Sequence, residues 1–254
     1  MKLRVLGCSG GIGGNLHTTS FLLDNDILID AGTGINELSL TELSMVNHIF
    51  ITHSHLDHIA CIPLLVDSVG FMRDKPITLY GTVDTLDTLK QHIFNWKIWP
   101  DFSEIPNAQQ PFMRYQQIKV GEEIVLQGRK ITAIPANHVV PAVGYHLDGG
   151  RSSLIFSGDT TTNDALWAIA NRVSNLKYMI VETAFSNSEK DLAVLSKHLC
   201  PSLLVEELAK FHGNAEIYIT HLKPGEVELI MREIDTAKQR LHPKMLLNNQ
   251  IFDL

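Results

Sequence analysis

Cysteine is scarce in this sequence, and the few cysteines are not paired. Three of the 254 residues are cysteines, and they stand far apart, at Cys8, Cys61 and Cys200. No Cys-x-x-Cys pair is present, so the sequence supports neither a disulfide framework nor a cysteine-based zinc ribbon. We expect three reduced thiols with structural roles.

Long apolar runs and basic tracts are also missing. No run is long enough to span a bilayer, and the N-terminus begins with strand-like residues rather than a secretion signal. Lysine and arginine total 21 against 28 acidic residues, which gives a net charge of −7. The sequence contains no cluster of lysine and arginine that would bind a nucleic-acid backbone. We therefore expect a cytoplasmic protein with no membrane contact, for which nucleic acid is a poor candidate partner.

The composition is that of a globular chain, with 44% hydrophobic and 19% charged residues. It contains no repeat, low-complexity segment or linker, so we expect one domain over residues 1–254. Prolines and aromatic residues between positions 95 and 111 predict a long irregular loop there.

Hydrophobic periodicity predicts strands with interspersed helices, an α/β (α+β) chain in which helices cover the outer faces of sheets. The predicted strands lie at 2–6, 20–24, 27–30, 46–52, 77–80, 122–126, 129–135, 142–147, 153–157, 177–182 and 216–220. The predicted helices lie at 38–44, 59–72, 83–94, 164–173, 192–198, 201–212 and 226–238.

The densest chemical signal is an H-x-H-x-D-H cluster between a predicted strand and a predicted helix. It consists of His53, His55, Asp57 and His58. Imidazole and carboxylate are the side chains that bind borderline divalent metals, and a strand-to-helix loop allows them to converge. The cluster therefore predicts a metal site.

Three further candidate ligands each follow a strand-like run: His138, Asp159 and His221. Alone, a histidine at a strand end is usually structural, and Asp159 has the alternative role of a helix N-cap. Together with the cluster they supply the roughly seven ligands that a two-metal site needs. Asp159 has two oxygens and is suited to bridge the two ions.

These motifs, in this order, resemble those of the metallo-β-lactamase fold superfamily. The resemblance implies a four-layer αββα sandwich and two divalent metal ions. His53, His55, His138 and Asp159 correspond to the first site, and Asp57, His58, Asp159 and His221 to the second. His55 stands where the redox branch of the superfamily has glutamate, which favours hydrolysis. The ligand set suits Zn²⁺, although such sites also accept Mn²⁺ or Fe²⁺.

Longer segments resemble the class II 3′,5′-cyclic-nucleotide phosphodiesterases. They are residues 53–59, 94–102, 137–145, 157–160, 196–199 and 220–224, which together span nearly the whole chain. Cys61 departs from the small residue of that family's signature. The resemblance implies hydrolysis of cAMP or cGMP to the nucleoside 5′-monophosphate by a metal-bridging hydroxide. It further implies a small-molecule cyclic nucleotide as the partner and a homodimer as the assembly.

Three residues are candidate catalytic groups beside the metals. Asp57 is placed to orient the hydroxide. Glu182 and His198 resemble the Glu–His pair of related tRNA-processing phosphodiesterases, in which the histidine protonates the leaving oxygen. The alternative for His198 is a structural role at a helix C-terminus. Lys223 is a further candidate for neutralising phosphate.

Two segments have open interpretations. The glycines Gly10, Gly11, Gly13 and Gly14 fit a tight turn better than a phosphate cradle, because neither Walker A nor G-x-G-x-x-G spacing is present. The loop from Trp96 to Phe102 is suited to stacking a base, lining a dimer interface or packing into the core.

Three rival functions remain. One is a tRNA 3′-processing endonuclease of the same superfamily, which calls for a basic arm that this sequence lacks. Another is hydrolysis of a lactone, thioester or β-lactam at the same centre. The third is a metal-holding or nucleotide-sensing protein without turnover, which is disfavoured because all seven ligands are present.

Overall fold

The computed structural model describes residues 1–237 and 240–254, and these form two seven-stranded sheets. The first sheet has the order β14-β1-β2-β3-β4-β5-β6. Its strands β14, β1, β2 and β3 pair antiparallel, whereas β3 to β6 run parallel. Their bounds are β1 Lys2–Gly7, β2 Ser20–Leu23, β3 Ile27–Ile29, β4 His48–Phe50, β5 Ile77–Gly81, β6 Met113–Gln117 and β14 Ile251–Asp253.

The second sheet has the order β13-β12-β11-β10-β9-β8-β7. Strands β7 to β10 form an antiparallel meander, and β10 to β13 run parallel. The bounds are β7 Glu123–Leu126, β8 Arg129–Pro135, β9 Val143–Asp148, β10 Ser153–Phe156, β11 Leu176–Glu182, β12 Glu216–Thr220 and β13 Lys244–Met245.

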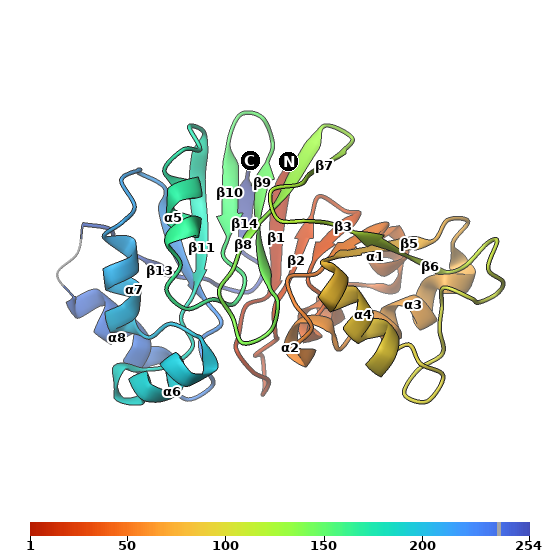
Figure 1. Ribbon diagram of the computed structural model, residues 1–254, viewed down its shortest axis with the longest axis horizontal. Coiled ribbons are helices and arrows are strands. Elements are labelled where there is room, and N and C mark those ends of the chain that lie inside the picture. Colours follow the sequence, from red (N-terminus) through yellow and green to blue (C-terminus); the bar gives the residue numbers. More distant parts are fainter. Residues whose placement is uncertain (238–239) are drawn as a thin grey trace.

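Helices cover the outer faces of both sheets, as Figure 1 shows. On one side lie α1 Leu40–Met45, α3 Ile62–Val69 and α4 Val83–His92, and on the other α5 Asp164–Ala170, α6 Lys190–Ser196, α7 Pro201–Leu208 and α8 Val227–Thr236. The short α2 Leu56–Ile59 lies at the lower edge of Figure 1. The predicted αββα sandwich is confirmed. None of the described helices is long and apolar enough to cross a membrane.

Three buried clusters fill the spaces between these four layers. The strand β3 shows how the alternation of side chains builds two of them. Leu28 faces the helices α1 and α3, whereas Ile27 and Ile29 face the second sheet. The third cluster lies between the second sheet and its helices and contains Trp167. Because both faces of each sheet are covered, the central strands β3 and β10 are buried along their whole length.

Most predicted elements are present, but two predicted helices differ from the structure and three strands were not predicted. The predicted helix 59–72 is divided into α2, α3 and a 3-10 turn at Gly70–Met72, with Cys61 as the N-cap of α3. The strands β6, β13 and β14 were not predicted. The predicted helix 226–238 ends at Thr236, and its last residue, Lys238, lies outside the described residues.

Candidate metal centre

Loops from both sheets meet at one edge of the sandwich. The H-x-H-x-D-H cluster follows the carboxyl end of β4, and His138, Asp159 and His221 follow β8, β10 and β12. In Figure 1 the loop after β8 descends towards α2 at this edge. The ends of buried strands are rigid supports, so residues just beyond them hold a defined position.

The structure brings all seven predicted ligands together in the two predicted sets. One set is His53, His55, His138 and Asp159, and the other is Asp57, His58, Asp159 and His221. Within each set one nitrogen or oxygen atom per residue lies within 4.8 Å of the others. Asp159 belongs to both sets, so its carboxylate stands between them. Whether these side chains ligate metal stays a prediction.

Three buried nitrogen atoms test whether this donor set fits metal ions. Nε2 of His53, Nε2 of His58 and Nδ1 of His221 are buried and have no hydrogen-bond partner among the described residues. A buried polar atom without a partner is costly and therefore rare. These nitrogens surround the Asp159 carboxylate at 3.3–3.7 Å. Metal ions between them would satisfy all three, so the residues fit a pair of divalent cations.

His58 is oriented by a buried carboxylate that was not among the predicted site residues. Asp30 lies fully buried at the end of β3, and its Oδ2 is 2.7 Å from Nδ1 of His58. The same carboxylate accepts hydrogen bonds from the backbone and hydroxyl of Thr52. A carboxylate at Nδ1 fixes the ring and directs Nε2 toward a metal. The only sequence signal was an aspartate at a strand end.

Burial keeps three imidazoles neutral. It lowers the pKa of His138 to about 4 and that of His221 to about 3, and it holds the pKa of His53 well below its ordinary value. A neutral imidazole has the free lone pair that a metal ligand needs. These three side chains are therefore ready to bind a cation without first losing a proton.

The other groups carry charge. Burial opposes ionisation of Asp159, but His221 and His58 hold its pKa well below the usual range. Burial likewise disfavours the His58 cation, yet Asp159 and Asp30 raise the pKa of His58 well above its ordinary value. A metal ion that binds Nε2 of His58 must displace this proton, so binding is accompanied by proton release.

Glu182 and His198 lie beside the two sets. Nδ1 of His198 is 2.7 Å from Oε1 of Glu182, and the ring of His198 stacks on that of His221 with centroids 5.1 Å apart. Glu182 is fully buried and also accepts a hydrogen bond from the backbone of Thr160. The predicted Glu–His pair is therefore formed, next to the candidate metal ligands.

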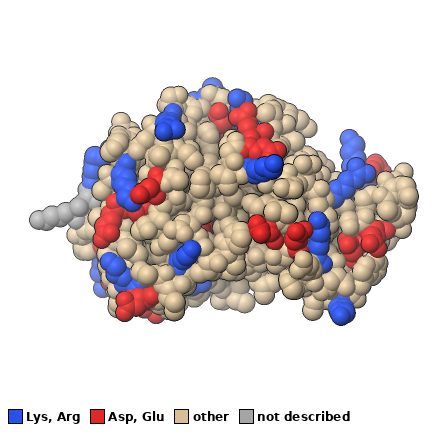
Figure 2. Space-filling model, in the orientation of Figure 1, with Lys and Arg blue, Asp and Glu red and all other residues tan. Residues whose placement is uncertain are grey.

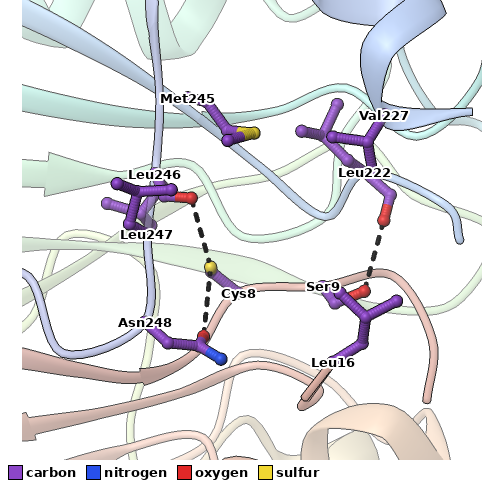
Figure 3. A pocket seen from close by; sticks show the side chains of 9 residues that line it. All are labelled: Cys8, Ser9, Leu16, Leu222, Val227, Met245, Leu246, Leu247 and Asn248. Atoms are coloured by element: carbon purple, nitrogen blue, oxygen red, sulfur yellow. Dashed lines mark hydrogen bonds between the residues drawn. The ribbon is translucent and has the colours of Figure 1, made fainter. Parts of the chain in front are cut away.

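The loop that contains Gly10, Gly11, Gly13 and Gly14 lies against His221, and Lys223 holds it there. Nζ of Lys223 donates to the carbonyl of Gly10 at 2.8 Å, so this amine holds the loop. A Cβ at Gly10 would lie 2.4 Å from the carbonyl oxygen of His221, which explains the glycine. The expected tight turn is present, because Leu16 donates to the carbonyl of Gly13. An apolar pocket of about 200 Å³ lies beside this loop, between Cys8, Leu222 and residues 245–248 (Figure 3).

The predicted aromatic loop has two different parts. Phe102 is buried in the core under the first sheet, and Trp99 packs against the same cluster. Trp96 is 59% exposed. Packing therefore accounts for Phe102, and the exposed Trp96 keeps the other two roles open.

A groove of about 400 Å³ runs from His138 to the start of α4. Its walls are residues 136–143, together with Val120, Thr82 and Asp84. Much of the lining is small and apolar, and the Asp84 carboxylate has no partner among the described residues. The groove provides space for a substrate beside one of the two ligand sets.

The layered fold and the shared aspartate are those of a metal-dependent hydrolase of metallo-β-lactamase fold. The model of the beta-lactamase superfamily domain matches residues 25–239, and the chain belongs to this family. The family predicted from the motifs is thus confirmed.

The similar proteins include phosphodiesterases and ribonucleases. A probable 3′,5′-cyclic-nucleotide phosphodiesterase of Yersinia pestis is 26% identical over 88% of this chain and 78% of its own. A ribonuclease Z of Methanocaldococcus jannaschii is 32% identical over 57% of this chain and 46% of its own. The crystal structure of unliganded yeast PDE1 superposes with a TM-score of 0.83, at 19% identity over 100% of this chain and 99% of its own. This last likeness establishes the fold.

Proposed function

We propose that this protein hydrolyses 3′,5′-cyclic nucleotides to nucleoside 5′-monophosphates at a two-metal centre. The observation that carries the proposal is the shared Asp159, which joins two ligand sets in which three buried nitrogens have no hydrogen-bond partner among the described residues. The probable cyclic-nucleotide phosphodiesterase of Yersinia pestis supports the choice of substrate. Zn²⁺ is the metal that best suits the His/Asp set, and Mn²⁺ or Fe²⁺ are alternatives.

The ligand residues have separate tasks in this proposal. His53, His55 and His138 would hold one ion, Asp57, His58 and His221 would hold the other, and Asp159, which belongs to both sets, would contribute to both. Two divalent ions, when bound, supply a nucleophile from water at neutral pH and neutralise charge on the phosphoryl oxygens. The Asp57 carboxylate is partly exposed and lies 3.7 Å from Nε2 of His221, and we assign it the task of orienting the attacking water.

Proton supply to the departing 3′ oxygen is assigned to His198. Its Nδ1 is held by Glu182, which leaves Nε2 as the atom that donates. Burial favours the neutral ring, but Glu182 and Asp159 outweigh burial and raise the pKa of His198 above its ordinary value. The imidazolium form of His198 therefore persists to higher pH than that of a free histidine, as suits a general acid.

The groove beside His138 is where we place the nucleoside. Its apolar walls suit the face of a base, and Asp84 contributes a carboxylate to its lining. A pocket with mostly apolar walls and few polar groups is typical of small-molecule sites.

Cleavage of an RNA precursor is the second candidate, and the 32% identical ribonuclease Z favours it. Figure 2 counts against it, because on the face shown lysine and arginine are scattered among acidic residues. A protein that grips a long polyanion concentrates its cations along the path of the backbone. The net charge of −7 also disfavours a polyanionic RNA substrate.

A substrate comparison tests the proposal. Metal-loaded protein is incubated with cAMP, cGMP, a pre-tRNA, bis(p-nitrophenyl) phosphate and nitrocefin, and the products are separated. We expect nucleoside 5′-monophosphate from a cyclic nucleotide. Cleavage of pre-tRNA with both cyclic nucleotides intact would instead establish the ribonuclease activity, and cleavage of nitrocefin alone would establish a lactamase.

A further inference from the structure

Lys197 has a backbone conformation that lysine rarely adopts. It is the C-cap of α6, with φ at 53° and ψ at 50°, in the left-handed region. This region is unfavourable for a side chain with a Cβ, and a residue remains there only when surrounding contacts hold it. Glycine is the usual residue at such a helix end. The contacts of Lys197 therefore need an explanation.

Two hydrogen bonds join Lys197 to His138 in opposite directions. Nδ1 of His138 lies 3.1 Å from the carbonyl oxygen of Lys197, and Nζ of Lys197 donates to the carbonyl oxygen of His138 at 3.1 Å. The two residues are 59 positions apart in the sequence. The lysine thus holds the imidazole through its backbone and the main chain of the same histidine through its ammonium group.

The first of these bonds decides which nitrogen of His138 carries a proton. A carbonyl oxygen only accepts, so Nδ1 must be the donor and Nε2 keeps its lone pair. Nε2 is the atom that lies 3.2 Å from Nδ1 of His55, inside the first ligand set. The carbonyl of Lys197 therefore selects the tautomer that can bind a metal.

The left-handed turn at Lys197 also places the next residue. The backbone N–H of Lys197 donates to Val194 and that of His198 to Ala193, which closes the helix. His198 then points to Glu182, with its ring centroid 4.9 Å from that of His138. A change in the turn would move both rings.

We propose that Lys197 is a positioning residue of the metal centre, which sets the tautomer and place of His138. Nζ of Lys197 is engaged by the His138 carbonyl, so it acts through this histidine and not on the substrate. The inference rests on the proposed two-metal centre. Loss of such a supporting contact typically weakens metal binding about 10–100-fold.

The test measures the two zinc affinities of the full chain by competition with a colorimetric chelator. Lys197→Met removes the ammonium group and with it the hydrogen bond to the His138 carbonyl, while the left-handed backbone at this position remains strained. Lys190→Met is the matched control, because Lys190 lies on the same helix α6 and its side chain makes no hydrogen bond or ion pair among the described residues. Lys197→Gly is a second variant that adopts the left-handed turn without strain, and it guards against misfolding.

We expect Lys197→Met and Lys197→Gly to weaken one zinc-binding step by about 10-fold or more and to leave the other unchanged. The weakened step should be the one that His138→Ala abolishes, and Lys190→Met should bind as the wild type does. Equal weakening of both steps, or no change in either, would overturn the role of Lys197. A wild-type protein that binds fewer than two ions would refute the two-metal centre, and this inference with it.

Discussion

Replacement of His198 by alanine separates proton donation from metal binding. The imidazole is buried, its Nδ1 is 2.7 Å from Oε1 of Glu182, and it belongs to neither ligand set. His198→Ala should therefore retain two ions per chain while it loses the group that protonates the leaving oxygen. Metal content is measured on the purified variant before any rate is compared.

The size of the expected effect follows from the chemistry of the leaving group. A positioned general acid contributes about 10²–10⁴ to a rate. Removal of the ring leaves space in which water can supply the proton, so we expect a fall in kcat of about 10²–10³ on a cyclic nucleotide. This corresponds to about 3–4 kcal/mol in the barrier.

The assay compares two phosphodiesters. The 3′ alkoxide of a cyclic nucleotide is a poor leaving group and needs the proton, whereas p-nitrophenolate leaves from bis(p-nitrophenyl) phosphate without one. We expect His198→Ala to lose activity on the first substrate and to keep most of it on the second. Equal losses on both substrates, or a wild-type rate on the cyclic nucleotide, would show that His198 is not the proton donor.

The pH dependence of kcat tests the role of His198 as proton donor independently. Burial alone would lower the pKa of His198, but Glu182 and Asp159 raise it. The donating imidazolium is present below this pKa and is lost as pH rises through it, so kcat should fall on the alkaline side. Glu182→Gln removes a raising influence, and the alkaline limb should move to lower pH. An unchanged limb would contradict the Glu182–His198 assignment.

Further substitutions and a chelator test the remaining parts of the site. Asp159→Ala removes the carboxylate common to both ligand sets, and we expect metal analysis to find fewer than two ions per chain; two tightly held ions would contradict the bridge. Asp30→Ala takes a fully buried acceptor from Thr52 and His58, and we expect chemical denaturation to show a loss of about 3 kcal/mol. Asp84 is suited to accept from N1–H and N2–H of guanine, so Asp84→Ala should lower kcat/KM for cGMP relative to cAMP by about ten-fold, with Asp87→Ala, on the same helix, as the control. Removal of metal by a chelator should lower the Tm, because ions that bind only the folded state stabilise it; an unchanged Tm would argue against the centre.

Local patterns were enough to predict the parts of this molecule that depend on neighbouring residues. The strand β8 has the predicted bounds 129–135 and β12 the predicted bounds 216–220. The H-x-H-x-D-H cluster begins in the loop after β4, as its flanking residues indicated, but Asp57 and His58 already lie in α2, which starts three residues before the predicted helix. Each of these features depends on side-chain periodicity or on spacing within a few residues.

Features that depend on distant contacts were not predicted. Asp30 reaches His58 across 28 positions, and Lys197 reaches His138 across 59. Nothing in the sequence near either residue marks the partner. The two-residue strand β13 and the three-residue β14 are short edge strands, whose pairing is decided by the neighbouring strand and not by their own pattern. The break between α2 and α3 coincides with another distant contact, because Ala31 donates to the carbonyl of His58 and accepts from the backbone N–H of Cys61.

The pairing of β14 with β1 has a consequence for synthesis of the chain. Lys2, Leu3 and Arg4 are opposite residues 253, 252 and 251, so β1 is completed only by a strand that is synthesised much later. Until those residues leave the ribosome, β1 has an open edge, and such edges recruit other strands. A nascent or truncated chain that lacks 251–254 should therefore depend on chaperones, even though every candidate metal ligand is already present.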